Sequence, residues 1–348
     1  MKLSFRWYGK EDGVTLEKIR QIPGLTTIVS ACYDTPPGAL WREETVKELG
    51  RLSGEFGLAF EVVEGLPVHE SIKLGEKDRE RYIGIYIENL RILARHGIQV
   101  VCYNFMPVFG WLRTDLHRRL ADGSATLAFD PQVLREKDPE KEELRLPGWT
   151  HSTGKEEVGR LLSAYQSLGK EGLRKNLRYF LEAVTPEAER LGLKLAIHPD
   201  DPPLPVFGLP RVVSTREDLL AIAKMTESRA CGFTLCTGSL GSSPKNDVVR
   251  IARELAAMGR VHFVHARNVL LRTDGGFEES GHWSGAGSLD MAAILRALYE
   301  EGFDGYIRPD HGRMIWGESG RPGYGLFDRA LGAFYLDGLW EAIEKGAI

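Results

Sequence analysis

Residues 193–198 (LKLAIH), 231–236 (CGFTLC), 261–266 (VHFVHA) and 305–308 (GYIR) are short, largely apolar runs of the kind that form buried strands. Segments with the spacing of amphipathic helices follow these runs, among them 245–258, 289–301 and 327–345. A regular alternation of strands and helices is typical of a parallel sheet, because a helix carries the chain back between parallel strands.

The first half of the chain repeats the pattern, with strands predicted at 3–8, 26–32, 58–63 and 98–105. The helices expected here cover 42–55, 78–96 and 156–191. The second of these is expected to stop at Gly97, since glycine favours the left-handed conformation that ends helices. Eight such strands predict a closed (β/α)8 TIM barrel, and without an evident linker we expect one domain over residues 1–348.

One long stretch, residues 106–155, interrupts the alternation after the fourth strand. It contains Trp111, a charged run (REKDPEKEELR) and the sequence Pro147-Gly148-Trp149, and we predict that it is irregular. An insertion of this length is either a lid over the mouth of the barrel or a solvated surface loop, and the sequence does not distinguish them.

The composition is that of an ordinary soluble globular protein, with 43% hydrophobic and 27% charged residues. The formal net charge of −4 argues against a nucleic-acid partner, and the lack of an 18-residue apolar run argues against a membrane span. The N-terminus lacks the apolar stretch of a secretory signal, so we expect a cytoplasmic protein. Its four cysteines, which show no CxxC spacing, are then free thiols.

Metal-binding residue types stand at the ends of four successive predicted strands: His198, Cys236, His265 and Asp310. Active sites of such barrels are built at the C-terminal ends of the strands. Each residue alone has an ordinary structural explanation, but together they supply the nitrogen, sulfur and oxygen ligands of a divalent transition metal. His262 lies near the start of its strand and is expected to be structural.

Further polar groups are expected near the same rim. His311 follows Asp310, and Tyr324 lies in the glycine-containing loop 321–325, where both could transfer protons. Trp7 and Asn104 lie near the ends of the first and fourth predicted strands and are predicted to contact substrate. Arg267 and Arg308 are predicted to bind a substrate carboxylate, with a structural salt bridge as the alternative for each.

These residues lie in motifs that resemble the mannonate dehydratase family: SFRWYG at 4–9, YNFMPVFGWLRTDL at 103–116, HPDDPP at 198–203, HFVHARN at 262–268 and RPDHG at 308–312. The resemblance extends from the first strand to the last. It implies a TIM barrel that converts D-mannonate to 2-dehydro-3-deoxy-D-gluconate and water during hexuronate (glucuronate) breakdown.

The same resemblance implies one Mn²⁺ or Fe²⁺ ion per subunit, held by His198, Cys236, His265 and Asp310, with His311 and Tyr324 as the acid/base pair. A thiolate with two imidazoles would by itself favour Zn²⁺, so the choice of metal comes from the family. The expected partner is a small sugar acid, and the sequence leaves open whether the chain forms a homo-oligomer.

Two other functions are compatible with these residues. A metal-dependent sugar isomerase or epimerase could use the same barrel without expelling water. A non-catalytic sugar-acid binding protein could retain the barrel as well, although a binder has no need of a redox-capable metal held by a thiolate.

Overall fold

The computed structural model describes residues 1–137 and 155–348, which form a closed barrel of eight parallel strands in the order β1-β12-β9-β8-β7-β4-β3-β2. All eight strands predicted from the sequence are present and account for the whole barrel. Their bounds are β1 (Lys2–Arg6), β2 (Thr27–Ser30), β3 (Ala59–Glu64), β4 (Val100–Tyr103), β7 (Lys194–Ile197), β8 (Cys231–Cys236), β9 (Val261–Ala266) and β12 (Tyr306–Pro309).

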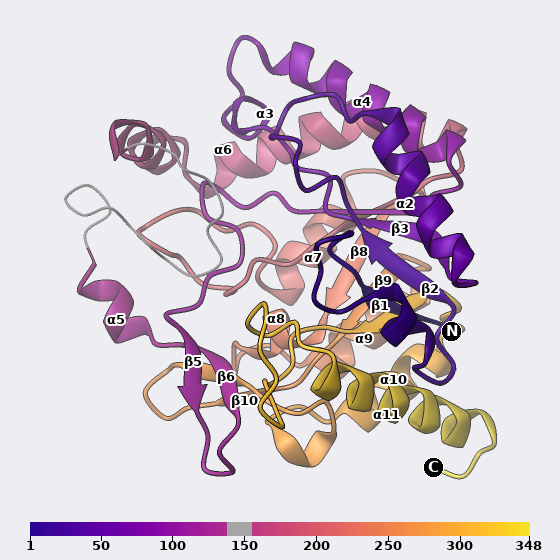
Figure 1. The fold of residues 1–348 in the computed structure, drawn as a ribbon. Coiled ribbons are helices and arrows are strands. Elements are labelled where there is room, and N and C mark those ends of the chain that lie inside the picture. The colour runs from indigo at the N-terminus through magenta and orange to yellow at the C-terminus, as the bar shows by residue number, and fades with distance from the viewer. Residues whose placement is uncertain (138–154) are drawn as a thin grey trace.

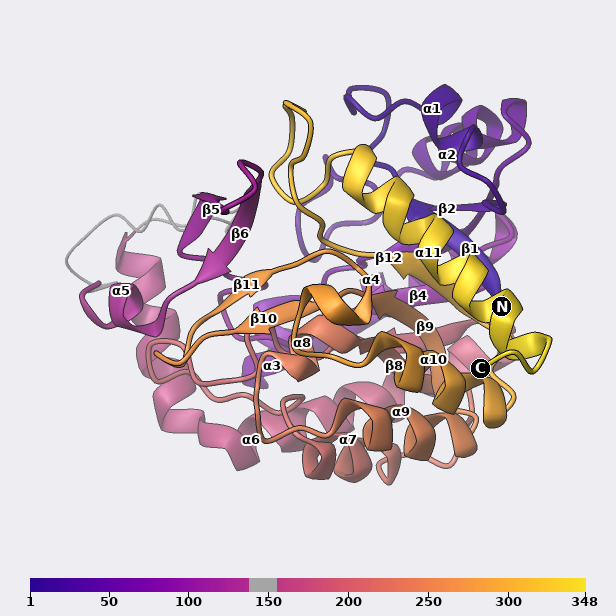
Figure 2. The same ribbon diagram turned by 90° about the horizontal axis from the view of Figure 1, so that it is seen from below.

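Helices surround the barrel, as Figures 1 and 2 show. Six longer ones match the helical patterns of the sequence: α2 (Glu43–Glu55), α4 (Arg79–Arg95), α6 (Lys155–Arg190), α9 (Val248–Ala257), α10 (Met291–Glu300) and α11 (Phe327–Glu344). Helix α6 has a kink at Gly169, where the backbone is not helical, and α7 (Arg216–Ala223) lies between β7 and β8. Helix α4 ends before Gly97, whose φ of 79° is the predicted left-handed conformation. Shorter helices that the sequence did not predict are α1 (Leu16–Arg20), α3 (Glu70–Leu74), α5 (Pro131–Arg135) and α8 (Thr237–Gly241).

Burial explains why the barrel strands are so apolar. Strands β8 and β9 are buried at every position, because one face of each meets the barrel interior and the other meets the helices. A separate cluster of buried side chains comes from six different strands, which can meet only inside the barrel. Its members are Val29, Val62, Val100, Cys102, Ala196, Phe263 and Tyr306.

The insertion after β4 differs from the irregular stretch that the sequence predicted. Its described part contains a hairpin of β5 (Asp115–Arg119) and β6 (Ala125–Phe129), while residues 138–154 lie outside the described part of the chain. The hairpin was missed because its strands are short, and because the sheet that it joins is completed by strands far along the chain. β6 pairs with β11 (Phe277–Glu279), which pairs with β10 (Val269–Leu271), to form a four-stranded antiparallel sheet.

This small sheet lies on the side of the barrel away from the two chain termini (Figures 1 and 2). Because β10 follows directly after β9, the sheet adjoins the C-terminal end of the barrel. Among residues 1–137 and 155–348, no helix has both the length and the apolar composition needed to cross a membrane.

Candidate metal centre and active site

Four metal-binding side chains converge at the C-terminal end of the barrel. His198 follows β7, Cys236 ends β8, His265 lies near the end of β9, and Asp310 follows β12. The Nε2 atom of His198 is 3.1 Å from Nδ1 of His265, and the ligand atoms of these two residues and Cys236 all lie within 4.8 Å of one another. Oδ2 of Asp310 is 3.8 Å from His265 Nδ1 and 3.9 Å from Cys236 Sγ. Because β7, β8, β9 and β12 are neighbours in the barrel, residues at their ends must meet.

The surroundings of the two imidazoles fit a bound cation. Nδ1 of His198 lies 2.7 Å from the carbonyl oxygen of Pro199, and Nε2 of His265 lies 3.1 Å from a carboxylate oxygen of Glu64. The carbonyl oxygen can only accept, so Nδ1 of His198 carries the proton, and the carboxylate beside Nε2 of His265 favours the proton on that nitrogen. The two remaining nitrogens then face each other with their lone pairs, an arrangement that a cation between them stabilises.

The charge of the cluster points the same way. Burial raises the pKa of Cys236, but the positive charge of Arg267, first among several neighbouring groups, outweighs burial and lowers that pKa well below its usual value. Burial likewise raises the pKa of Asp310, and Arg308 more than compensates for it. The thiolate and the carboxylate are therefore the stable forms, and these are the forms that bind metal.

His311 and Tyr324, the predicted acid/base pair, are in direct contact. The ring Nε2 of His311 is 2.8 Å from the Tyr324 hydroxyl, and both side chains are buried. The ring of Trp111, from the insertion, lies 5.0 Å from the His311 ring between centroids. Burial and the neighbouring Tyr8 and Asp310 raise the pKa of Tyr324 well above 10, although Arg6 and Arg308 oppose the shift, so this hydroxyl stays protonated.

The whole chain is similar to the proteins of a known family. The family model described as D-mannonate dehydratase (UxuA) matches residues 1–348, the whole chain. The chain belongs to the mannonate dehydratase family. A mannonate dehydratase of Streptococcus agalactiae serotype III is 51% identical over 347 residues, covering all of both chains.

Solved structures agree with this family. The crystal structure of mannonate dehydratase from Streptococcus suis serotype 2 has a TM-score of 0.93 and 45% identity, covering 100% of this chain and 96% of that one. A D-tagatose 3-epimerase-like protein matches with a TM-score of 0.57 at 16% identity, with all of both chains covered. This second likeness shows the barrel fold alone, whereas the first is to a member of the dehydratase family.

Of the four predicted substrate contacts in this mannonate dehydratase family member, the two arginines contact the candidate ligand cluster and the other two residues make no hydrogen bond to it in the part of the chain that the structure describes. Arg267 and Arg308 lie beside the candidate metal ligand Asp310, with Arg267 Nε 3.3 Å from Asp310 Oδ2 and Arg308 Nη1 2.8 Å from Asp310 Oδ1. Both guanidinium groups are fully buried in ion pairs with protein carboxylates. Trp7 and Asn104 follow β1 and β4 as expected, but within the described residues no side-chain hydrogen bond joins either to the ligand cluster.

Several buried charged residues of the site were not predicted. Glu64 stands at the end of the third strand, so its position alone could have indicated it. Arg113 lies in the insertion, within the motif at 103–116 that resembles the family, whereas Glu279 lies in the short strand β11, where the sequence carried no comparable signal. Together with Asp201 and Arg267 they form a buried network of ion pairs between the small sheet and the barrel.

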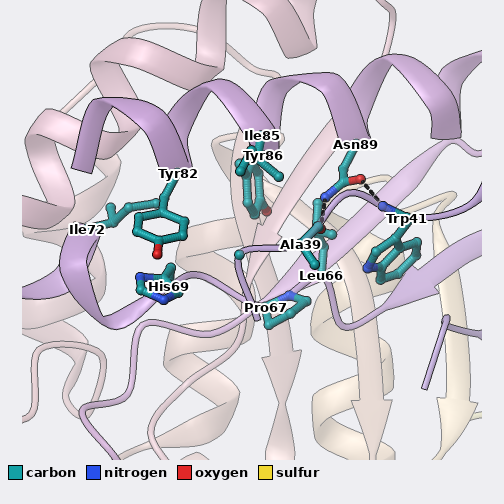
Figure 3. A pocket seen from close by; sticks show the side chains of 11 residues that line it. Ala39, Trp41, Leu66, Pro67, His69, Ile72, Tyr82, Ile85, Tyr86 and Asn89 are labelled. Atoms are coloured by element: carbon teal, nitrogen blue, oxygen red, sulfur yellow. Dashed lines mark hydrogen bonds between the residues drawn. The ribbon is translucent and has the colours of Figure 1, made fainter. Parts of the chain in front are cut away.

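A separate small pocket lies between α4 and the loops after β2 and β3 (Figure 3). Its polar group Asn89 accepts a hydrogen bond from the Trp41 backbone at 2.8 Å and donates one to the Ala39 carbonyl at 3.1 Å. The ring of His69 stacks on Tyr82. None of the metal-ligand or acid/base side chains lines this pocket, and its contacts connect the loops to α4.

Proposed function

We propose that this chain converts D-mannonate to 2-dehydro-3-deoxy-D-gluconate and water, as a step of glucuronate breakdown. The supporting observation is the convergence of four metal-binding side chains beside the hydrogen-bonded pair His311 and Tyr324. Membership of the mannonate dehydratase family supplies the substrate and the reaction.

The proposed ligands of the ion are His198, Cys236, His265 and Asp310, and we propose Mn²⁺ or Fe²⁺ as its identity. When bound, a divalent ion supplies positive charge that stabilises the negative charge developing on the substrate carboxylate. Family membership, rather than the ligand set, favours these ions over Zn²⁺.

We assign the base to His311 and the acid to Tyr324. The Nε2 atom of His311 takes the proton from C2, and the Tyr324 hydroxyl gives its proton to the hydroxyl that leaves C3 as water. The C2–C3 double bond forms as the C3–O bond breaks, and the enol product becomes the 2-keto acid. The raised pKa of Tyr324 supports this division of roles, since a neutral phenol is a donor.

The other proposed contacts follow from position. Trp7 and Asn104 stand at the same end of the barrel as the ligands, and we retain them as contacts to the sugar acid. The guanidinium groups of Arg267 and Arg308 already pair with protein carboxylates. We therefore propose that their positive charge offsets the repulsion between Asp310 and the substrate carboxylate.

The test is an assay for a 2-keto-3-deoxy acid after incubating D-mannonate with the Mn²⁺-loaded protein. The Tyr324→Phe variant removes one hydroxyl, and we expect its kcat to fall about 10²- to 10⁴-fold. The fold remains intact, as circular dichroism would check. An isomerase or epimerase would instead return an isomer of mannonate with no loss of water, and a binding protein would give no product at all.

A further inference from the structure

We propose that Glu279 is a positioning residue that fixes the tautomer of His311, so that its Nε2 atom carries the lone pair that takes the substrate proton. This inference rests on the proposed function, in which His311 transfers the proton. Glu279 ends β11, outside the barrel, and its side chain is fully buried.

The contacts of Glu279 carry the argument. Its Oε1 atom lies 3.2 Å from Nδ1 of His311, and it accepts hydrogen bonds from Arg113 Nη2 at 2.6 Å and from Arg113 Nε at 3.1 Å. Arg267 Nη1 also donates to the same oxygen. Two guanidinium groups therefore hold the carboxylate in place, and its pKa lies below the usual value because Arg267 and Arg113 outweigh the effect of burial.

A second contact at Nδ1 has to be weighed against this one. Arg267 Nη1 lies 3.0 Å from His311 Nδ1 and could donate to it, which would place the ring proton on Nε2. The Tyr324 hydroxyl decides between the two arrangements. Within residues 1–137 and 155–348, the one hydrogen-bond partner of that buried hydroxyl is His311 Nε2, at 2.8 Å. A phenol proton needs an acceptor, so Nε2 carries the lone pair and Nδ1–H donates to Glu279.

The small sheet explains how Glu279 keeps its place. Neighbouring residues of β11 pair with β6, with Phe277 opposite Phe129 and Glu278 opposite Ala128. The hydroxyl of Thr126, on β6, donates to the backbone oxygen of Glu279 at 2.8 Å. The insertion thus acts on the barrel chemistry by holding a carboxylate against the back of the proposed base, as a buried aspartate does for the histidine of serine proteases.

Asp201 offers a matched control for this proposal. Its carboxylate binds the same two guanidinium groups, with Arg113 at 2.9 and 3.1 Å and Arg267 at 2.7 Å, and it is equally buried. No hydrogen bond joins it to His311 in the described part of the chain. Asp201→Asn and Glu279→Gln therefore remove one carboxylate each from the same arginine pair, but only the second alters the partner of His311.

The kinetic test compares kcat and KM of these two variants with D-mannonate as substrate. The glutamine amide would donate to Nδ1 and stabilise the wrong tautomer. We expect kcat of Glu279→Gln to fall at least about 100-fold below that of Asp201→Asn, with KM of the two within threefold. Urea unfolding of both variants measures the structural cost that they share. If kcat falls equally in both, Glu279 has only the structural role of its arginine partners and the proposal is overturned.

A spectroscopic test needs no change at Glu279. Nitrogen-15 NMR of the full-length protein loaded with diamagnetic Zn²⁺ reports which ring nitrogen of His311 carries the proton, with His311→Gln used to assign its signals. Protonation at Nδ1 is expected, and protonation at Nε2 overturns the proposal. Neither result depends on turnover, so failure of the dehydratase function itself would be seen separately, as a wild-type protein that yields no keto acid.

Discussion

Strand β9 carries two histidines, three positions apart, in opposite surroundings. His262, near its N-terminal end, packs against the backbone of Gly232, where a Cβ atom would lie 2.4 Å from its Nε2. His265, near the C-terminal end, lies 3.1 Å from Glu64 and 3.1 Å from His198. Both side chains are buried, so burial alone does not distinguish a structural histidine from a metal ligand.

The difference lies in the charges around each ring. Burial lowers the pKa of His262 to about 3, with help from the nearby positive charges of Lys194 and Arg260, so this ring is neutral at pH 7. His265 is instead surrounded by buried charged side chains, including Glu64, Arg308 and Asp310. The N-terminal end of the barrel is thus built for packing, while the C-terminal end concentrates charge that serves chemistry.

The largest effect is expected from breaking the metal site at one end of β8. Cys236→Ser removes the thiolate, and we expect loss of bound metal and a fall in kcat of about 10³-fold, which corresponds to several kcal/mol of transition-state stabilisation. Metal content by mass spectrometry and the keto-acid assay measure both. Cys231→Ser, at the buried N-terminal end of the same strand, should keep metal and activity. Full metal occupancy in Cys236→Ser would contradict the assignment of this ligand.

The second-largest effect is expected on the free energy of unfolding, from breaking the buried ion pairs at the C-terminal end of the barrel. Arg308→Met leaves Glu64 and Asp310 without the guanidinium that lies 2.8 to 3.0 Å from their oxygens. Glu64 keeps Arg6 and Asp310 keeps Arg267, but two buried carboxylates lose one guanidinium partner each, so we expect a loss of about 3–5 kcal/mol in the free energy of unfolding by urea. Arg253→Met, which breaks a surface pair with Glu300, should change stability little. Equal losses in the two variants would show that burial adds nothing to the Arg308 pairs.

The same contrast explains what the sequence could predict. The eight barrel strands and the meeting of four metal-binding residue types were predictable, because strand patterns are local and because the topology brings successive strand ends together. The ion pairs were not, since Arg113 and Glu279 are 166 positions apart and Glu64 and Arg308 are 244 apart. Nothing local specifies that such residues meet, and the three-residue strand β11 is too short for a pattern.

The arginines show the limit for single residues. The sequence placed Arg267 and Arg308 at the right end of the barrel, and both lie there. It could not show that protein carboxylates already occupy their guanidinium groups, because the partners Glu279 and Glu64 come from distant segments. A residue's position along a strand follows from local pattern, whereas its partner is set by packing.

The smallest expected effect is a pH-dependent change in the free energy of unfolding, caused by His262 near the N-terminal end of the barrel. The folded protein holds His262 with a pKa of about 3, below the ordinary 6.5, so the unfolded chain binds a proton first as the pH falls. The resulting stability is fully present above pH 6.5 and is lost as the pH falls toward 3. Between pH 7 and pH 5 the wild type should lose about 2 kcal/mol that a His262→Leu variant does not lose. Urea unfolding at the two pH values measures this difference, and an equal loss in both proteins would contradict it. The variant should also keep its metal and its kcat at pH 7, because the N-terminal end takes no part in the chemistry.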